Sequence, residues 1–321
     1  MQKKINIKDQ AVWIMLVVLA AGFSIAVPNF ATAGNLVTIL RQVANIGILA
    51  VGMTFVMISG GIDLSIGNQM GLISIVSALL MVEYGVSPLP SCLVGLLVGA
   101  IVGLINGLLI TYTKMPPLIA TLGMSYVAKG LAFIITEGYP VYGLPQSAKW
   151  MGQGYLFDIP FAPVCVLIMA AVIAIGAFIM NKTYVGRQFY ALGSNEEAAR
   201  LAGLKVNRIR VLAYVISGLM AALSGIVMMS RVNSGQALNG NGMEMDALIA
   251  CVVGGVSVSG GEGKATGMIG GMLVMGILAN GMAVAGMSEY VQMLVKGGVL
   301  IAVVAIDCFT RTHTKKAPAK K

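Results

Sequence analysis

Long apolar segments separated by short polar ones occupy most of the chain. A helix needs about 20 apolar residues to cross a bilayer, and fewer where its ends are buried in protein. Unpaired backbone groups are costly in lipid, so such segments are expected to be helical except where protein covers a break. Ten segments qualify, at approximately 11–27, 42–59, 66–83, 91–111, 117–136, 161–180, 211–230, 245–259, 266–284 and 291–308. The pattern predicts an all-α integral membrane protein with about ten transmembrane helices in a single domain, residues 1–321.

The composition agrees with a membrane protein. Of the 321 residues, 58% are apolar and 10% are charged, whereas soluble domains carry about 25% charged residues. The net charge of +9 could indicate nucleic-acid binding, but the charges lie between and beyond the apolar segments. That arrangement orients a membrane protein. We therefore expect membrane lipid, and no nucleic acid, around this chain.

Lysine and arginine positions predict the orientation. With the N-terminus in the cytoplasm, 16 of the 21 basic residues fall on the inner side, including a basic cytoplasmic tail at 309–321. Only Arg41, Lys149 and Arg231 fall outside, while Lys129 and Lys296 fall within spans. Because basic residues collect in cytoplasmic loops, we expect both termini inside and a multi-pass protein of the bacterial inner membrane.

The N-terminal segment has two interpretations. Basic residues precede its first apolar run, and Ala31-Thr32-Ala33 follows it, as in a cleavable signal peptide. The run is longer than a usual signal core, however, and further spans follow. These features favour a retained first helix.

The cytoplasmic loop at 182–210 contains the pattern of a short helix. Ser194 and Glu197 have the spacing of a capping box, and Gly203 is placed to end the helix. The helix at 195–203 would carry one small apolar face with charged flanks. The residues of this predicted coupling element are Gly193, Ser194, Asn195, Glu196, Glu197, Ala198, Ala199, Arg200, Leu201, Ala202 and Gly203.

A helix of about two turns is unstable alone, so it needs a surface to pack on. A separate ATPase and the lipid headgroups are the two alternatives. A lipid-bound helix usually carries Lys or Arg with Trp, Phe or Leu. Here Ala198, Leu201 and Ala202 form a small face behind an acidic first turn, which favours docking to a protein.

Residues 186–203 resemble the cytoplasmic loop of ribose-type ABC permeases, the membrane subunits of bacterial monosaccharide importers. Three further segments agree in the same order, namely 52–67, 117–123 and 254–263. The resemblance implies ten-helix subunits that pair with a second permease copy, as a homodimer or a related heterodimer. It also implies a cytoplasmic ABC ATPase that binds ATP and magnesium, and a periplasmic sugar-binding protein. The chain departs from the pattern in having both Gly60 and Gly61 and a long Lys-rich tail.

Polar residues inside the apolar segments are candidates for the translocation path. Asp63 follows two glycines at a break between spans, and interrupted helices often mark transport sites. Amides can donate and accept hydrogen bonds to sugar hydroxyls without adding charge. The alternatives are a helix cap and ordinary hydrogen bonds between helices. The candidates are Asn45, Asp63, Ser65, Asn68 and Asn106.

The sequence contains no recognisable catalytic motif. Residues 260–264 faintly resemble a phosphate-binding loop, but Val258 and Ala265 occupy positions where that motif needs Gly and Ser or Thr. The only histidine is His313. We expect no enzyme activity, no metal and no cofactor on this chain. The alternative function is an ion-coupled secondary transporter, with Asp63 as its titratable residue.

Overall fold

A computed structural model describes residues 7–159 and 161–314. Lys3 and Lys4, and the part of the predicted basic tail from 315 to 321, lie outside the described residues. The helices and strands, in order, are α1 (Ile7–Ala26), α2 (Ala33–Ile58), α3 (Ile66–Val82), α4 (Pro88–Tyr112), α5 (Pro117–Thr136), β1 (Val141–Tyr142), α6 (Gln146–Gln153), the 3-10 turn η1 (Leu156–Asp158), α7 (Val164–Lys182), α8 (Tyr184–Ser194), α9 (Glu196–Leu201), α10 (Val206–Val232), β2 (Ser234–Gly235), α11 (Met243–Val253), α12 (Ala265–Val284) and α13 (Glu289–Thr314).

The prediction of an all-α membrane protein is confirmed. Among the described residues, seven helices are long and apolar enough to cross a membrane: α2, α4, α5, α7, α10, α12 and α13. The part Gln10–Ala26 of α1 and the whole of α3 are shorter apolar helices, and α11 has 11 residues. The predicted span at 245–259 is therefore wrong at its end, because α11 stops at Val253 and two glycines follow it.

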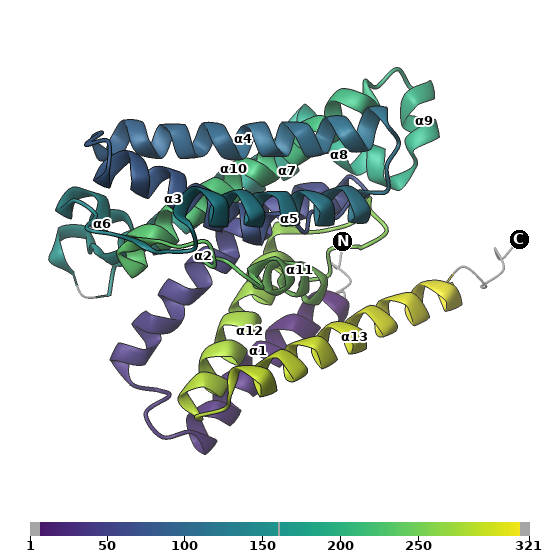
Figure 1. Cartoon of the computed structure of the whole chain (residues 1–321). Coiled ribbons are helices and arrows are strands. Elements are labelled where there is room, and N and C mark those ends of the chain that lie inside the picture. The colour runs from purple at the N-terminus through teal and green to yellow at the C-terminus, as the bar shows by residue number, and fades with distance from the viewer. Residues whose placement is uncertain (1–6, 160, 315–321) are drawn as a thin grey trace, which may run out of the picture.

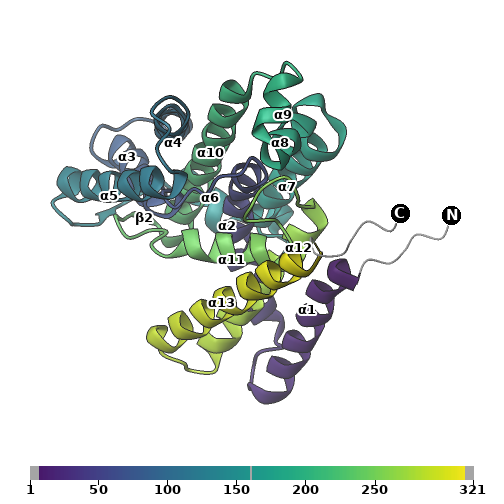
Figure 2. The same cartoon turned by 90° about the vertical axis from the view of Figure 1, so that its right-hand side faces the viewer.

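Helix α10 lies at the centre of the bundle and packs against α2, α3 and α4 (Figure 1). A second group, α1, α11 and α12, packs on the other side of α2, with α13 against α11 and α12 (Figure 2). The ammonium group of Lys296 lies 2.8 Å from the carboxylate of Asp246 and joins α13 to α11. The predicted tail begins as helix, because α13 continues to Thr314.

The segments between α5 and α7 and between α10 and α11 pack on the bundle. Strands β1 and β2 pair antiparallel, and Ser230 in α10 bonds to two backbone groups of α6, the carbonyl of Ala148 and the N–H of Gly152, both at 2.7 Å. Through these contacts the two segments pack on one another and on α10. Tyr139 and Trp150, both in the segment between α5 and α7, remain exposed.

Helices α4 and α10 approach so closely that only glycine fits at the contact. A methyl group added at Gly103 would overlap the carbonyl oxygen of Tyr214, and one added at Gly99 would overlap that of Gly218. Small residues at four-residue spacing allow such an approach between membrane helices. The glycines at positions 99, 103 and 107 therefore mark the face of α4 that meets α10.

Gly103→Val should separate α4 from α10 and lower stability by about 1–3 kcal/mol, the usual cost of overpacking. Thermal unfolding of the purified protein in detergent measures the loss. Gly123→Val is the matched control, because a methyl group there meets nothing within 4 Å. Equal melting temperatures for the two variants would contradict the assigned contact.

Candidate coupling and translocation sites

The predicted cytoplasmic loop is helical over most of its length. Helix α8 begins after Thr183, whose hydroxyl accepts a hydrogen bond from the N–H of Gly186 at 3.1 Å. The sequence prediction for residues 182–210 contained only the helix at 195–203 and did not include α8. Its signals are weak but present: a threonine N-cap and an apolar face formed by Phe189 and Leu192, both buried.

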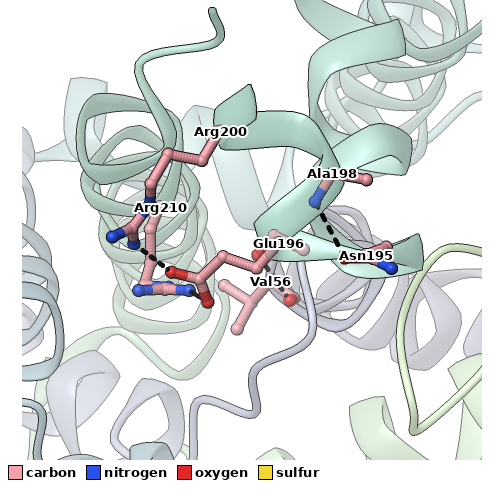
Figure 3. A network of polar contacts seen from close by, with 7 residues as sticks. Val56, Asn195, Glu196, Ala198, Arg200 and Arg210 are labelled. Carbon is pink, nitrogen blue, oxygen red and sulfur yellow. Dashed lines mark hydrogen bonds and ion pairs between the residues drawn. The ribbon is translucent and has the colours of Figure 1, made fainter. Parts of the chain in front are cut away.

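The predicted helix at 195–203 exists as α9, which spans Glu196–Leu201. The predicted cap residue is wrong. Asn195 caps α9 by accepting a hydrogen bond from the N–H of Ala198 at 2.9 Å (Figure 3). Ser194 is the last residue of α8, and its hydroxyl instead donates to the carbonyl of Tyr190 at 2.8 Å. Gly203 follows α9 with φ of +82°, as expected for a glycine that ends a helix.

Helix α9 presents its small apolar face outward. Ala198, Leu201 and Ala202 are exposed, and Leu201 keeps 84% of its surface accessible. Ala199 points the other way and is 5% exposed. The helix is therefore seated on its own chain through Ala199, while the face predicted to dock a partner is free in the isolated chain.

Glu196 holds α9 to the first turns of α10. Its carboxylate forms an ion pair with Arg200 at 2.9 Å and a second one with Arg210 of α10 (Figure 3). Partial burial alone would raise the pKa of Glu196, but the hydrogen bonds and charges of Arg210 and Arg200 outweigh it and lower that pKa below its usual value. The carboxylate is thus ionised at neutral pH, and α9 is fixed in orientation relative to α10.

Three of the five candidate path residues meet in one buried network at the break between α2 and α3. The Asp63 carboxylate accepts hydrogen bonds from the N–H of Ser65 at 3.0 Å and from its hydroxyl. Its other oxygen accepts one from the hydroxyl of Ser217, in α10, at 2.8 Å. The Ser65 hydroxyl in turn accepts from the amide of Asn106 in α4 at 2.9 Å and from that of Gln69 at 2.6 Å.

Asn68 and Asn45 lie outside this network. The Asn68 amide donates to the hydroxyl of Ser125 in α5 at 2.7 Å. Asn45 lies beside α10, where the Ser224 hydroxyl donates to its backbone carbonyl at 3.3 Å. All five candidates are buried. The structure therefore gives every one of them a contact within the chain, and their role in translocation stays a prediction.

Gln69 and Ser217 are members of the network that the sequence reasoning missed. Gln69 had a usable signal, because it stands four residues after Ser65 on a predicted helix, where side chains meet. Ser217 had none, since it lies 154 positions from Asp63 and only the packing of α10 brings the two together. Asp63 precedes the first turn of α3 and bonds both to Ser65, the residue before that helix, and to Ser217 in α10. Ser65 extends the network to Asn106 in α4.

Asp63→Ala should destabilise the break, because it removes both carboxylate oxygens that accept hydrogen bonds from Ser65 and Ser217. Leaving the buried N–H of Ser65 without an acceptor costs about 1–3 kcal/mol, and the bond from Ser217 is lost as well. Thermal unfolding in detergent measures this loss. Ser217→Ala, which removes one of these bonds, should lose less. A loss for Asp63→Ala no greater than for Ser217→Ala would contradict this account.

Glu196→Gln should loosen α9 by no more than about 1 kcal/mol, because these ion pairs are partly exposed and screened. Hydrogen exchange of the α9 amides measures the effect. A carboxyl with a lowered pKa stabilises the fold above its unfolded pKa of about 4.3 and loses that contribution as the pH falls through the lowered value. After correction for intrinsic exchange, wild-type α9 should lose protection in acid, and the Gln variant should show no such step.

Comparison with known proteins agrees with this architecture. Residues 35–304 match the family model described as the branched-chain amino acid transport system / permease component. The chain is 43% identical over 294 residues to a ribose import permease protein of Bacillus subtilis, covering 91% of this chain and 90% of the relative. It is 38% identical over 303 residues to a ribose import permease protein of Escherichia coli, covering 93% of each.

An L-arabinose transport system permease protein of E. coli is 38% identical over 296 residues, with 91% of this chain and 89% of the relative covered. No solved protein structure matches the chain. These relatives are transport components rather than enzymes, in agreement with the expectation from sequence. The family match and the relatives each span most of the chain, so the chain belongs to the branched-chain amino acid transport system / permease component family, and within it resembles the ribose-type ABC permeases.

Proposed function

We propose that this protein is the membrane-spanning permease subunit of an ATP-driven importer for a monosaccharide of the ribose class. The relatives named for ribose and L-arabinose match it over nine-tenths of its length, and both sugars are neutral polyols. Hydroxyl and amide groups, such as those joining α3, α4 and α5, suit such a solute because they add no charge. In this proposal a periplasmic sugar-binding protein delivers the substrate.

The single observation that carries ATP coupling is the exposed face of α9. A six-residue helix survives here because Ala199 is buried beneath it and Glu196 is paired to Arg210. Its opposite face leaves Leu201 84% exposed, and a large apolar side chain so exposed suits a partner groove. We assign that groove to a cytoplasmic ABC ATPase, which would bind ATP and magnesium, with no cofactor on this chain.

The proposed topology has ten membrane helices with both termini in the cytoplasm. Helices α1, α3 and α11 would complete the seven longer spans, each shortened because protein covers one end. Figure 1 places the end of α13 on the same side of the molecule as α9. This arrangement, in the bacterial inner membrane, fits the inward bias of the basic residues.

A complete translocation path would need a second permease copy, identical or related, beside this one. Oligomers of membrane subunits are usually symmetric, and the apolar outer faces of α5 and α13 are exposed in the single chain. The ion-coupled alternative is disfavoured, because the relatives are permease components and both oxygens of Asp63 are occupied by hydroxyl and N–H donors of the same chain.

Leu201→Glu should abolish docking of the ATPase, because it places a charge on the exposed apolar face without touching the contacts that seat α9. Co-purification of the ATPase and ATP-dependent sugar uptake in proteoliposomes should both fall at least about tenfold, as for loss of a central interface side chain.

Glu83→Gln is the control, since Glu83 is exposed and follows α3, outside α9 and its exposed face. Normal uptake by the Leu201 variant would refute the role of α9. Uptake by cells that lack the ATPase but keep a proton gradient would restore the ion-coupled function.

A further inference from the structure

Four glycines from three separate segments meet where α8 ends. Gly60 follows α2, Gly193 lies in the last turn of α8, and Gly260 and Gly261 lie in the loop between α11 and α12. We call them the glycine junction. A methyl group added at Gly260 would lie 2.9 Å from the Cα of Gly60 and 3.0 Å from the carbonyl oxygen of Gly193. Backbone therefore meets backbone here, with no side chain between.

At Gly193 it is the closeness of the neighbouring backbone, and not the local backbone conformation, that requires glycine. Gly60, Gly260 and Gly261 have positive φ angles, so glycine is favoured there on conformation alone. Gly193 is helical and has no such need, and glycine destabilises a helix relative to alanine. A methyl group at Gly193 would overlap the carbonyl oxygen of Ile58, the last residue of α2.

Hydrogen bonds fasten the same three segments together. The N–H of Gly261 donates to the carbonyl of Ile58 at 2.9 Å, which satisfies one of the free carbonyls at the end of α2. The hydroxyl of Tyr190, in α8, donates to the carbonyl of Gly263 at 2.8 Å. The end of α8 is thus joined both to the end of α2 and to the loop before α12.

The junction leads directly to the Asp63 network. Gly61 follows Gly60 and leaves room for the hydroxyl of Tyr214, which a methyl group at position 61 would overlap. Two residues later, Asp63 bonds to Ser217 in α10 and to Ser65 before α3. A shift of α8 would therefore displace the segment after α2, in which Gly60 is only three residues from Asp63.

We propose that the glycine junction transmits the movement of α9 to the α2–α3 break around Asp63, with Gly193 as the positioning residue at the contact. Packed backbone cannot yield as a flexible side chain can, so it passes on small displacements instead of absorbing them. The inference rests on the proposed function, in which a partner ATPase moves α9. It adds the route by which that movement enters the membrane.

A second route exists in the structure and provides a contrast. Glu196 joins α9 directly to Arg210 on α10. Movement passed mainly through this ion pair would reach α10 without involving the junction. The two routes predict opposite results for variants at Gly193 and Glu196.

The test uses the full chain assembled with its ATPase and sugar-binding protein in proteoliposomes. Gly193→Ala should leave ATPase co-purification within about twofold of wild type and lower ATP-dependent uptake about tenfold, within the range for lost coupling. Gly22→Ala is the matched control, a helical glycine of α1 with open space around it, and should transport normally. Normal uptake by the Gly193 variant would overturn the inference, and loss of uptake by Glu196→Gln beside it would assign the transmission to the ion pair.

A probe at the break separates transmission from a merely structural effect. Ser59 is buried beside the junction, so Ser59→Cys is introduced into a chain whose four native cysteines are replaced by alanine. Its reactivity toward a water-soluble thiol reagent should change on addition of ATP in the otherwise wild-type complex. Gly193→Ala should abolish that change, and an undiminished change would overturn the inference.

Tyr190→Phe keeps the inference testable where the Gly193 variant does not assemble, because it removes one hydrogen bond and adds no atoms. It should reduce the ATP-dependent change in reactivity, whereas Tyr84→Phe, at an exposed tyrosine after α3, should not. Equal responses from the two tyrosine variants would overturn the inference. A wild-type complex without ATP-dependent uptake would refute the proposed function itself, whatever the variants do.

Discussion

Backbone that leaves a helix inside a membrane must find its hydrogen bonds within the protein, and the segment between α2 and α3 is where this chain meets that constraint. Asp63 accepts hydrogen bonds from Ser65 and Ser217, and Asn106 of α4 donates one to Ser65. The helices that supply these partners, α3, α4 and α10, are also the ones that pack closely around it. Much of the bundle can therefore be understood as the protein cover that this break requires.

Close approach is the second consequence. Hydroxyl and amide side chains are short, so the helices bearing them must come near enough for bonds of about 3 Å. Glycines at positions 99, 103 and 218 allow α4 and α10 to do so. Glycines at 60, 193, 260 and 261 allow the end of α8 to approach the segment after α2 and the loop before α12 in the same way. The frequent glycines thus serve packing at two levels of the molecule.

Helix α9 is rigidly fixed to its own chain on one face and is free on the other. Ion pairs of Glu196 and burial of Ala199 fix α9 to its own chain, while Leu201 faces outward. An element that receives force from a partner needs both properties, because a loosely held helix would move without moving the bundle. Direct backbone contact between α8 and the end of α2 extends the same rigidity toward the membrane.

The apolar segments, the short helix near 196–201 and the break before Asp63 can be predicted from the amino-acid sequence alone. Each of these features depends only on residues that are neighbours along the chain. The predicted cap at Ser194 was wrong, because two adjacent residues can both cap a helix and only the end of α8 selects Asn195. Only the tertiary structure brought Ser217 to Asp63 and Ile58 to Gly193. Those pairs lie more than a hundred residues apart, and helix packing, which no local periodicity encodes, decides which of them meet.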